Sequence, residues 1–320
     1  MRPLSGSSSH LVSSSAIFLL LAAAACGGTS PGEGTQPGAG TSAGDAALSV
    51  YTVNYPLAYF TGRIGADEVD VVLPVALTEG DPAYAEPGAE VIAEMQGADL
   101  IVRNGAGYAQ WFAMATLPTD KVVDTSAAFA DRVIVEEGAT THSHGPEGEH
   151  THSATAFTTW LDPQLAIAQA EAIETALATR RPAAAASFDA NLTALRADLL
   201  DLDESFAAAA AAIGDAPLLA SHPVYQYFAR RYDLDLESVH FEPGIMPDES
   251  QWQGLAELHA SHPARWMIWE AQPAADIAAR LEAMGIGVVV IDPCATPPAA
   301  GDYLSVMRDN AAHLASAAAR

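Results

Sequence analysis

The amino-acid sequence predicts an α/β fold in which two βα-repeat domains with parallel sheets face a cleft and are joined by one long backbone helix. Three observations predict this fold. Short apolar runs alternate with helical stretches from residue 47 onward, the alternation stops over 182–213, and it then resumes. Short apolar strands that are separated by helices need crossover connections, and such connections produce parallel sheets.

The first 25 residues are expected to be a signal peptide rather than part of the fold. An apolar run of about ten residues, 16–25, is too short to span a bilayer but has the length of a signal-peptide core. Small residues precede Cys26, as in bacterial lipoprotein processing sites, so we expect Cys26 to carry a lipid. The alternative is an ordinary signal peptide cut near Ala25. Residues 26–46 are rich in glycine, serine, threonine and proline, which is typical of a flexible tether.

The first domain is predicted over residues 47–181. Strands are expected at 48–53, 69–73, 99–102 and 121–124, and helices at 56–65, 87–96 and 108–115. The strands are short runs rich in valine, isoleucine and leucine, residues that suit a buried parallel sheet. After a long polar loop, Asp162 and Pro163 begin another helix, because aspartate is a strong N-cap and proline is favoured at the first helical position.

A single helix over 182–214 is predicted to link the two domains. The segment contains no proline or glycine between its first residue and Gly214, and its large apolar residues recur every three or four positions. About thirty helical residues at ~1.5 Å each extend ~45 Å, which is more than the width of a small domain. One arm of a local helix pair is the alternative interpretation.

The second domain is predicted over residues 215–320 by the same alternation. Strands are expected at 218–220, 236–241, 266–269 and 288–291, and helices at 223–231, 248–262, 273–284 and from about 303. In open α/β sheets, ligands bind beyond the carboxyl ends of the strands, so the cleft between two such sheets is the expected binding site.

The charge of the chain excludes two classes of partner. Of the 320 residues, 40 are acidic and 14 basic, which gives a formal net charge of −26, and Lys121 is the one lysine. Nucleic acids and anionic lipid surfaces require a basic footprint, so neither is an expected partner. The acidic excess permits a cationic ligand, but an acidic surface more often serves solubility.

A histidine-rich segment is the clearest local signal for chemistry. Four histidines and two glutamates fall within eleven residues of the polar loop 139–156; the histidines are His142, His144, His150 and His152. Imidazole is the commonest protein ligand for zinc, and two His-x-His pairs offer it at high local density. Because Gly145 and Gly148 make the loop supple, we expect loose, mobile capture of metal in preference to a permanent structural site.

Three further polar residues stand at the ends of predicted strands in the second domain. His222 follows the strand at 218–220, Glu270 ends the strand at 266–269, and Asp292 ends the strand at 288–291. Each alone has an ordinary explanation as a turn former or a helix cap. Together, one neutral histidine and two carboxylates would balance the charge of a divalent cation in a cleft of low dielectric. The large aromatic residues, such as Tyr225 and Tyr227, are interpreted as core or cleft wall.

Five stretches stand out from residue 47 onward: GDPAYAEPGAEVIAEMQGADLIVRNGAGYAQWF, the histidine-rich loop leading into TWLDP, FDANLTALRADLLDLD, ASHPVYQYFARRYDL and IDPCATPPAAGDYLSVMRDNAAHL. In content and in order they resemble the zinc- and manganese-binding proteins of bacterial ABC importers. The resemblance implies two α/β domains pinned by a rigid helix, with one metal ion between them that is delivered to a membrane permease.

The resemblance also implies four metal ligands, and this chain departs from that pattern at two of them. The third and fourth positions fall on His222 and Asp292, whereas Ala83 and Thr158 stand at the first two, where the family has histidines. Three explanations are open: the site is rebuilt with Glu270 and a histidine of the 142–152 segment, the ligand is different, such as a metal chelate, or metal binding is lost. We favour the first.

The sequence therefore predicts a lipid-anchored, extracytoplasmic solute-binding protein for a divalent metal, and not an enzyme. Zn²⁺ fits the supply of imidazole better than Mn²⁺, which is the alternative. The expected partners are an ABC permease in the cytoplasmic membrane and the lipid bilayer that holds Cys26, and we expect a monomer. The rival interpretations are a binding protein of the same fold for a chelate, and a lipoprotein metallohydrolase. The second rival lacks a Ser-His-Asp or His-Glu-x-x-His pattern.

Overall fold

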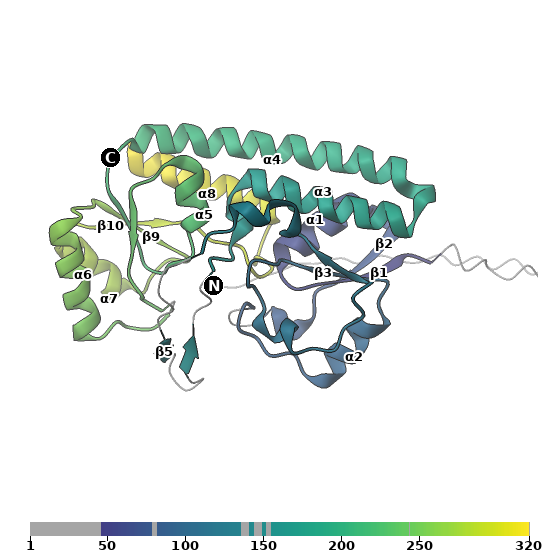
Figure 1. Ribbon diagram of the computed structural model, residues 1–320. Coiled ribbons are helices and arrows are strands. Elements are labelled where there is room, and N and C mark those ends of the chain that lie inside the picture. Colours follow the sequence, from purple (N-terminus) through teal and green to yellow (C-terminus); the bar gives the residue numbers. More distant parts are fainter. Residues whose placement is uncertain are drawn as a thin grey trace, which may run out of the picture. The chain divides into compact units, whose positions relative to one another are not determined.

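The first half of the fold is a parallel sheet of four strands with the order β2-β1-β3-β4. Figure 1 shows the whole chain, with β1, β2 and β3 of this sheet labelled. The computed structural model describes residues 46–78, 82–135, 141–143, 149–151, 155–242 and 244–319, and for 141–143 and 149–151 only the backbone. The strands are β1 (Leu48–Thr52), β2 (Val69–Val72), β3 (Leu100–Arg103) and β4 (Val122–Asp124). All four predicted strands are confirmed to within two residues at either end.

Two of the three helices expected beside this sheet are confirmed. They are α1 (Tyr55–Gly65), which Asn54 caps, and α2 (Ala89–Gly97). The helix expected at 108–115 is wrong, because that stretch holds only a short 3-10 turn, Gln110–Ala113. Ala106 and Ala109 have φ angles of +50° and +57°, and this left-handed backbone cannot continue a right-handed helix.

The second half of the fold is another parallel four-stranded sheet, with the order β10-β9-β7-β8. Its strands are β7 (Leu218–Ala220), β8 (Leu236–Ser238), β9 (Trp266–Trp269) and β10 (Gly287–Val290). Its helices are α5 (Gln226–Tyr232), α6 (Glu249–Ser261), α7 (Ala275–Ala283) and α8 (Tyr303–Ala318). The order of elements matches the prediction, and α6 and α8 begin at the capping aspartates Asp248 and Asp302.

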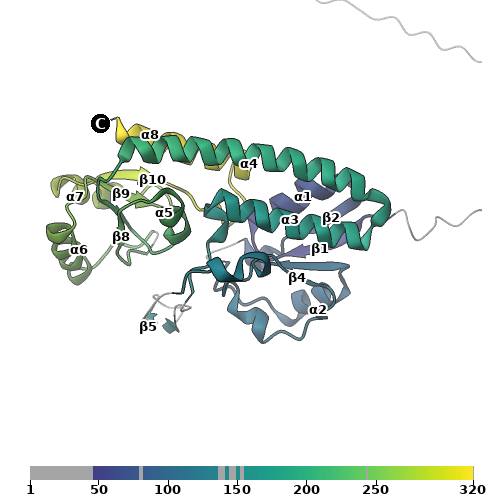
Figure 2. The ribbon, with the colours of Figure 1, turned by 45° about the horizontal axis from the view of Figure 1, so that its top comes forward.

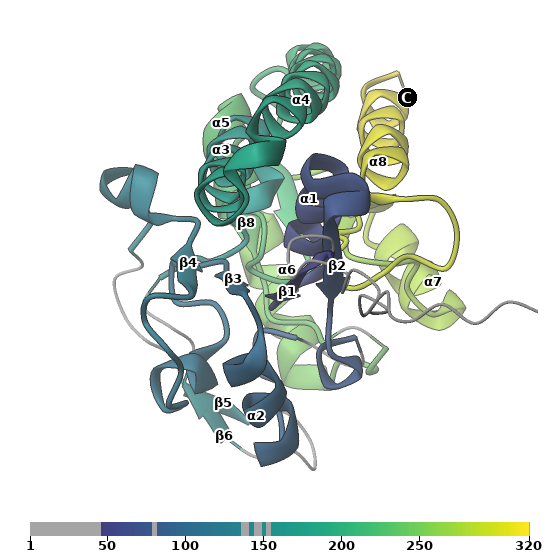
Figure 3. The same cartoon turned by 90° about the vertical axis from the view of Figure 1, so that its right-hand side faces the viewer.

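The predicted linking helix is α4 (Ala185–Ile213), which follows α3 (Pro163–Arg180). Its 29 residues extend ~43 Å at ~1.5 Å per residue. It packs against α1 and α3 beside the first sheet and against α5 and α8 beside the second. Figures 1 and 2 show α4 running past both halves, and Figure 3, viewed nearly along it, shows α1, α3 and α8 grouped at its side.

A buried charged group joins three of these helices. Asp203 of α4 accepts hydrogen bonds from Arg231 and Tyr232 of α5 and from Gln164 at the start of α3. Burial alone would raise the pKa of Asp203, but the hydrogen bonds from its arginine, glutamine and tyrosine partners lower the pKa below the ordinary value of 3.8. The group therefore fixes α5 against the long helix.

The two sheets share one hydrophobic core. A single cluster includes Val50 and Leu100 from the first sheet and Leu218 and Ile268 from the second. The carboxyl edges of the sheets also meet, since the N–H of Tyr55, just after β1, donates to the carbonyl of Ala295, beyond β10, at 3.0 Å. Residues 46–320 form one compact unit, and the predicted domain boundaries at 181 and 214 stay a prediction.

The histidine-rich segment contains a short antiparallel ladder where the sequence predicted a supple loop. Strands β5 (Thr141–Ser143) and β6 (Glu149–Thr151) pair so that His142 lies opposite His150. Threonine favours extended backbone, which helps to explain strands at this place. We call β5 and β6 together the histidine hairpin. His144 and His152 lie outside the described residues, as do residues 1–45 with Cys26. Within the described parts of the chain, no helix has the length and apolar character needed to cross a membrane.

Candidate metal site at the carboxyl ends of the strands

His222 stands two residues beyond β7, at the edge where the two sheets meet. The strand places it there because the N–H of Ser221 still donates to Ile268 of β9, and the chain then turns at Pro223. The turn is closed by a hydrogen bond of 2.9 Å from the Val224 N–H to the His222 carbonyl. The side chain of His222 is largely buried, with 14% of its surface exposed.

Glu270 is the first residue after β9, the strand next to β7, and its carboxylate faces His222. The distance from His222 Nδ1 to Glu270 Oε1 is 3.4 Å, and the Glu270 side chain is 24% exposed. The Oε1 atom itself is buried and has no hydrogen-bond partner among the described residues. A buried carboxylate oxygen without a hydrogen bond is costly, so this position favours a cationic ligand. The ring of His240 lies 6.0 Å from the ring of His222.

Asp292 follows β10, the outer neighbour of β9, and is held from both sides. Asn310 of α8 accepts from its N–H at 3.0 Å and donates to its carbonyl at 2.7 Å, while the Cys294 N–H donates to its Oδ1 at 2.7 Å. Burial raises the pKa of Asp292 and the charge of Glu270 raises it further, whereas the Cys294 N–H lowers it. Asn310 and the Cys294 N–H therefore fix the loop that carries Asp292.

The hydroxyl of Tyr225 is buried directly beside the backbone of Asp292. Burial raises the pKa of Tyr225 well above 10.0, and the charges of Glu270 and Asp292 raise it further. The hydroxyl donates to the carbonyl of Ile291 at 2.7 Å, directly before Asp292. The three residues that the sequence singled out thus gather at one edge, where His222 and Glu270 are in contact. Even so, no group of three His, Cys, Asp or Glu side chains within the described ranges has the geometry to hold a metal ion.

Ala83 and Thr158 stand on the other side of this edge and offer no nitrogen. Ala83 is 2% exposed and belongs to the shared core. Thr158 is 4% exposed, and its hydroxyl donates to the carbonyl of Val224 in a short hydrogen bond. Two residues later, Trp160 Nε1 donates to the carbonyl of Pro293 at 2.7 Å. The hydrogen bonds of Thr158 and Trp160 therefore connect the first half of the fold to the loops that carry His222 and Asp292.

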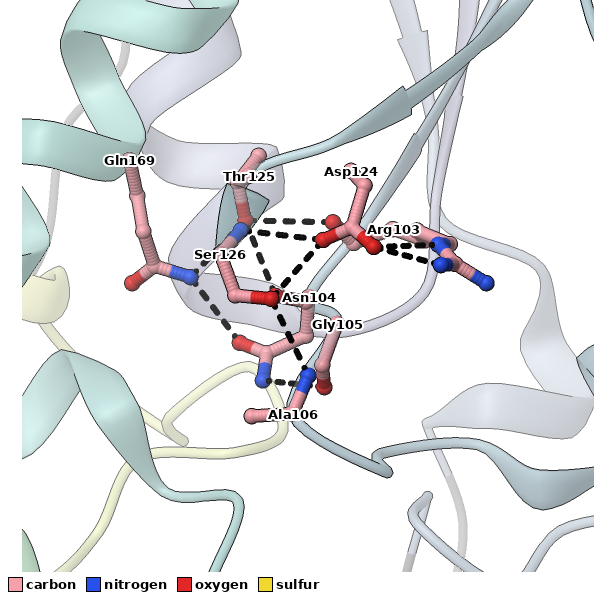
Figure 4. Close-up of polar contacts among 8 residues, drawn as sticks. All are labelled: Arg103, Asn104, Gly105, Ala106, Asp124, Thr125, Ser126 and Gln169. Carbon is pink, nitrogen blue, oxygen red and sulfur yellow. Dashed lines mark hydrogen bonds and ion pairs between the residues drawn. The ribbon is translucent and has the colours of Figure 1, made fainter. Parts of the chain in front are cut away.

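A polar network that the sequence reasoning missed fixes the segment around Thr158. Figure 4 shows the part of it that contains Asn104, Thr125 and Gln169. Its centre is Asn104, which is fully buried just after β3. Asn104 Nδ2 donates to the Phe157 carbonyl at 2.9 Å, and Asn104 Oδ1 accepts from Gln169 Nε2 at 3.0 Å and from the Thr159 hydroxyl at 3.3 Å. Gln169 also donates to Thr125 at 2.9 Å.

Gly105, next to Asn104, is the residue in the sequence that could have pointed to this network. Its φ angle is +74°, and a Cβ atom there would lie 2.0 Å from Ser126 Oγ and 2.1 Å from Asp124 Oδ1. Only glycine fits such a position. The run Asn-Gly-Ala-Gly directly after a buried strand is therefore a local sign that side chains crowd the backbone at this strand end.

Comparisons with known proteins identify the family of the chain. The family model described as zinc-uptake complex component A, periplasmic, matches residues 50–317. The high-affinity zinc uptake system protein ZnuA of Bacillus subtilis is 30% identical over 248 residues, which cover 76% of this chain and 73% of that protein. The zinc-binding lipoprotein AdcA of Streptococcus pneumoniae is 26% identical over 277 residues, 83% of this chain but 55% of AdcA. The chain thus spans about half the length of AdcA.

Solved structures show the same fold. Zn(II)-bound AdcA from Streptococcus pneumoniae superposes with a TM-score of 0.72 at 21% identity, over 86% of this chain and 58% of that chain. The metal-dependent lipoprotein YcdH from Bacillus subtilis superposes with a TM-score of 0.71 at 22% identity, over 84% and 98%. The expected two-domain α/β fold and the expected family are confirmed. The chain belongs to the zinc-uptake complex component A family.

Proposed function

We propose that the chain is an extracytoplasmic solute-binding lipoprotein that captures a divalent metal ion, zinc in the first place, and delivers it to an ABC permease. It performs capture and handover and catalyses no reaction. The observation that carries the proposal is the contact of 3.4 Å between His222 Nδ1 and Glu270 Oε1, at the carboxyl edge of a sheet in a zinc-uptake family member.

The spacing of these two atoms suits a shared zinc ion. Zinc binds protein nitrogen and oxygen atoms at about 2.0–2.1 Å in tetrahedral sites, so two neighbouring ligand atoms stand about 3.3–3.4 Å apart. A hydrogen bond between the same groups would be shorter, at about 2.7–3.2 Å. His222 and Glu270 are therefore spaced as two corners of a zinc tetrahedron.

Asp292 and the histidine hairpin would supply the other donors. Asp292 follows β10, which pairs with β9 and so ends at the same sheet edge as Glu270, and its carboxylate would be a second oxygen ligand. One neutral imidazole with two carboxylates balances a charge of two, which lowers the cost of burying the ion. The histidine-rich segment, with His142, His144, His150 and His152, would gather zinc and complete the coordination in place of the two histidines that are replaced by Ala83 and Thr158.

The proposal includes the surroundings of the protein. Cys26 would carry a lipid, residues 26–46 would act as a tether, and the folded part would work as a monomer beside the permease. The family description is that of a periplasmic component of a zinc-uptake complex. Zinc is favoured over manganese because imidazole is a better ligand for zinc.

A zinc titration of the metal-free chain from residue 26 onward tests the proposal. His222→Ala should weaken zinc binding at least ~10-fold, because an imidazole ligand is lost. His313→Ala, which removes an exposed histidine of α8, is the matched control and should bind like the parent. Circular dichroism spectra of each variant and the parent show whether a lower zinc affinity comes from misfolding or from the loss of a ligand. If His222→Ala binds zinc as tightly as the parent, the site is wrong.

The same titration separates the rival interpretations. A deletion of residues 142–152 that leaves affinity unchanged would exclude the rebuilt site but keep the family function. A parent chain that ignores free zinc but binds a zinc complex of a small chelator would make the chelate the cargo. Hydrolysis of an ester or phosphoester by the zinc-loaded parent, lost in His222→Ala, would instead favour the metallohydrolase.

A further inference from the structure

The base of the histidine hairpin is closed by backbone contacts between two legs. We define the legs as 133–135, which leads toward β5, and 155–157, which continues from β6. Val135 and Thr155 form an antiparallel bridge. The N–H of Ala156 donates to the carbonyl of Ile134 at 3.0 Å. The two ends of the histidine-rich segment are therefore held together before it reaches its histidines.

One side-chain hydroxyl joins both legs to another part of the fold. The Tyr227 hydroxyl accepts a hydrogen bond of 3.2 Å from the Ile134 N–H and donates one of 2.9 Å to the Ala156 carbonyl. Tyr227 is fully buried, in a small apolar cluster with Phe129, Ala156 and Leu165. Burial raises the pKa of Tyr227 above 10.0, so the hydroxyl keeps its proton and can donate near neutral pH.

Arg230 supports the same attachment. Its guanidinium lies 5.0 Å from the centre of the Tyr227 ring and donates to the carbonyl of Arg132, which precedes the first leg, at 2.6 Å. A cation over an aromatic face attracts the ring and limits its rotation. Arg230 thus joins the Tyr227 ring to the residue that precedes the first leg.

Tyr227 belongs to the segment that carries His222. Its helix, α5, begins at Gln226, only a few residues after His222, and the turn between them is fixed by two contacts. The Tyr225 hydroxyl donates to Ile291, and the Thr158 hydroxyl donates to Val224. Residues 222–227 therefore hold the candidate ligand at one end and the anchor of the hairpin at the other.

We propose that Tyr227 is a positioning residue, whose hydroxyl places the base of the histidine hairpin at a fixed position relative to His222. This inference rests on the proposed function, since its effect on binding requires that zinc is held at His222. A tether with a fixed base presents its groups to a nearby site at a higher effective concentration than a loose one. Tyr227 thereby carries the contribution of the hairpin to zinc binding.

A double-mutant cycle between Tyr227→Phe and a deletion of residues 142–152 tests the inference. In the parent, Tyr227→Phe should weaken zinc binding about three- to tenfold, as expected for a lost buried hydroxyl with two hydrogen bonds. In the deletion variant the same substitution should change nothing, because no hairpin remains to be positioned. Equal weakening in both backgrounds would show that Tyr227 acts through α5 and His222 instead, and would overturn the inference. So would a deletion that leaves the affinity of the parent unchanged.

Tyr232→Phe is the matched control. It removes another tyrosine hydroxyl from the same helix, one that donates to Asp203 at 2.9 Å and does not touch the hairpin legs. Its zinc affinity should equal that of the parent. An affinity loss as large as that of Tyr227→Phe would mean that any loosening of α5 is sufficient, which would contradict a special role for Tyr227.

Hydrogen exchange gives a readout that does not depend on zinc. Tyr227→Phe should accelerate exchange of the Ile134 amide, which loses its acceptor, and leave the Ser221 and Val224 amides near His222 unchanged. Unchanged exchange at Ile134 would refute the anchor. If the parent binds no zinc, the proposed function fails, and this exchange measurement alone decides whether the hydroxyl fixes the base.

Discussion

The substitution Asn104→Ala should destabilise the protein by about 2–5 kcal/mol, because it leaves buried polar groups without partners. Asn104 is fully buried and makes one hydrogen bond to the Phe157 carbonyl and two through its own oxygen. Gln169 keeps its second partner, Thr125, so the Phe157 carbonyl and the Thr159 hydroxyl account for most of the loss. Each such group costs about 1–3 kcal/mol, and the small cavity adds to the total.

Urea unfolding of the metal-free protein measures this loss, and two variants make the result interpretable. Asn104→Asp keeps the shape but sets a carboxyl oxygen against the Phe157 carbonyl at a fully buried position, so it should lose at least as much stability as Asn104→Ala. Asn191→Ala removes an amide that donates to Ile64 from a partly exposed position, and should cost only about 0.5–1.5 kcal/mol. An Asn104→Ala variant that loses no more than Asn191→Ala would refute the view that Asn104 is the centre of the network.

Three further predictions concern stability. The arginine, glutamine and tyrosine partners of Asp203 lower the pKa of its carboxyl in the folded state. The ionised carboxylate therefore stabilises the fold above pH ~3.8, and this stabilisation is lost as the pH falls through the folded-state pKa. Tm measured from pH 2 to 7 should fall less steeply at the acid end in Asp203→Asn than in the parent. Gly105→Ala should lower Tm far more than Gly214→Ala, because both glycines have positive φ but only the first faces atoms within 4 Å; equal losses would contradict this. Trp160→Phe should cost about 1–3 kcal/mol in urea unfolding, since it leaves a buried carbonyl beyond Asp292 without its donor, and a neutral result would mean that water replaces the indole.

Strands and helices were predictable because their signals are local. A run such as 218–220 is apolar on both faces, and helix starts such as Asp162 and Asp248 carry their own capping side chains. The same periodicity placed His222, Glu270 and Asp292 at strand ends. The helix expected at 108–115 failed because positive φ angles at two alanines leave no mark in the alternation of apolar residues.

The strand order created the candidate site. His222 and Glu270 are distant in the sequence, and they meet because β7 and β9 are neighbours in the second sheet, an order that no local pattern specifies. The sequence analysis did not single out Asn104, and it interpreted Tyr227 as core or cleft wall. Their partners, the Phe157 carbonyl and the hairpin legs, come from remote segments. Residue spacing along the chain therefore determined which side chains reach the carboxyl edges of the sheets. Packing between the two halves decided which of these side chains are in contact, because contacts between remote segments depend on how whole helices and strands pack together.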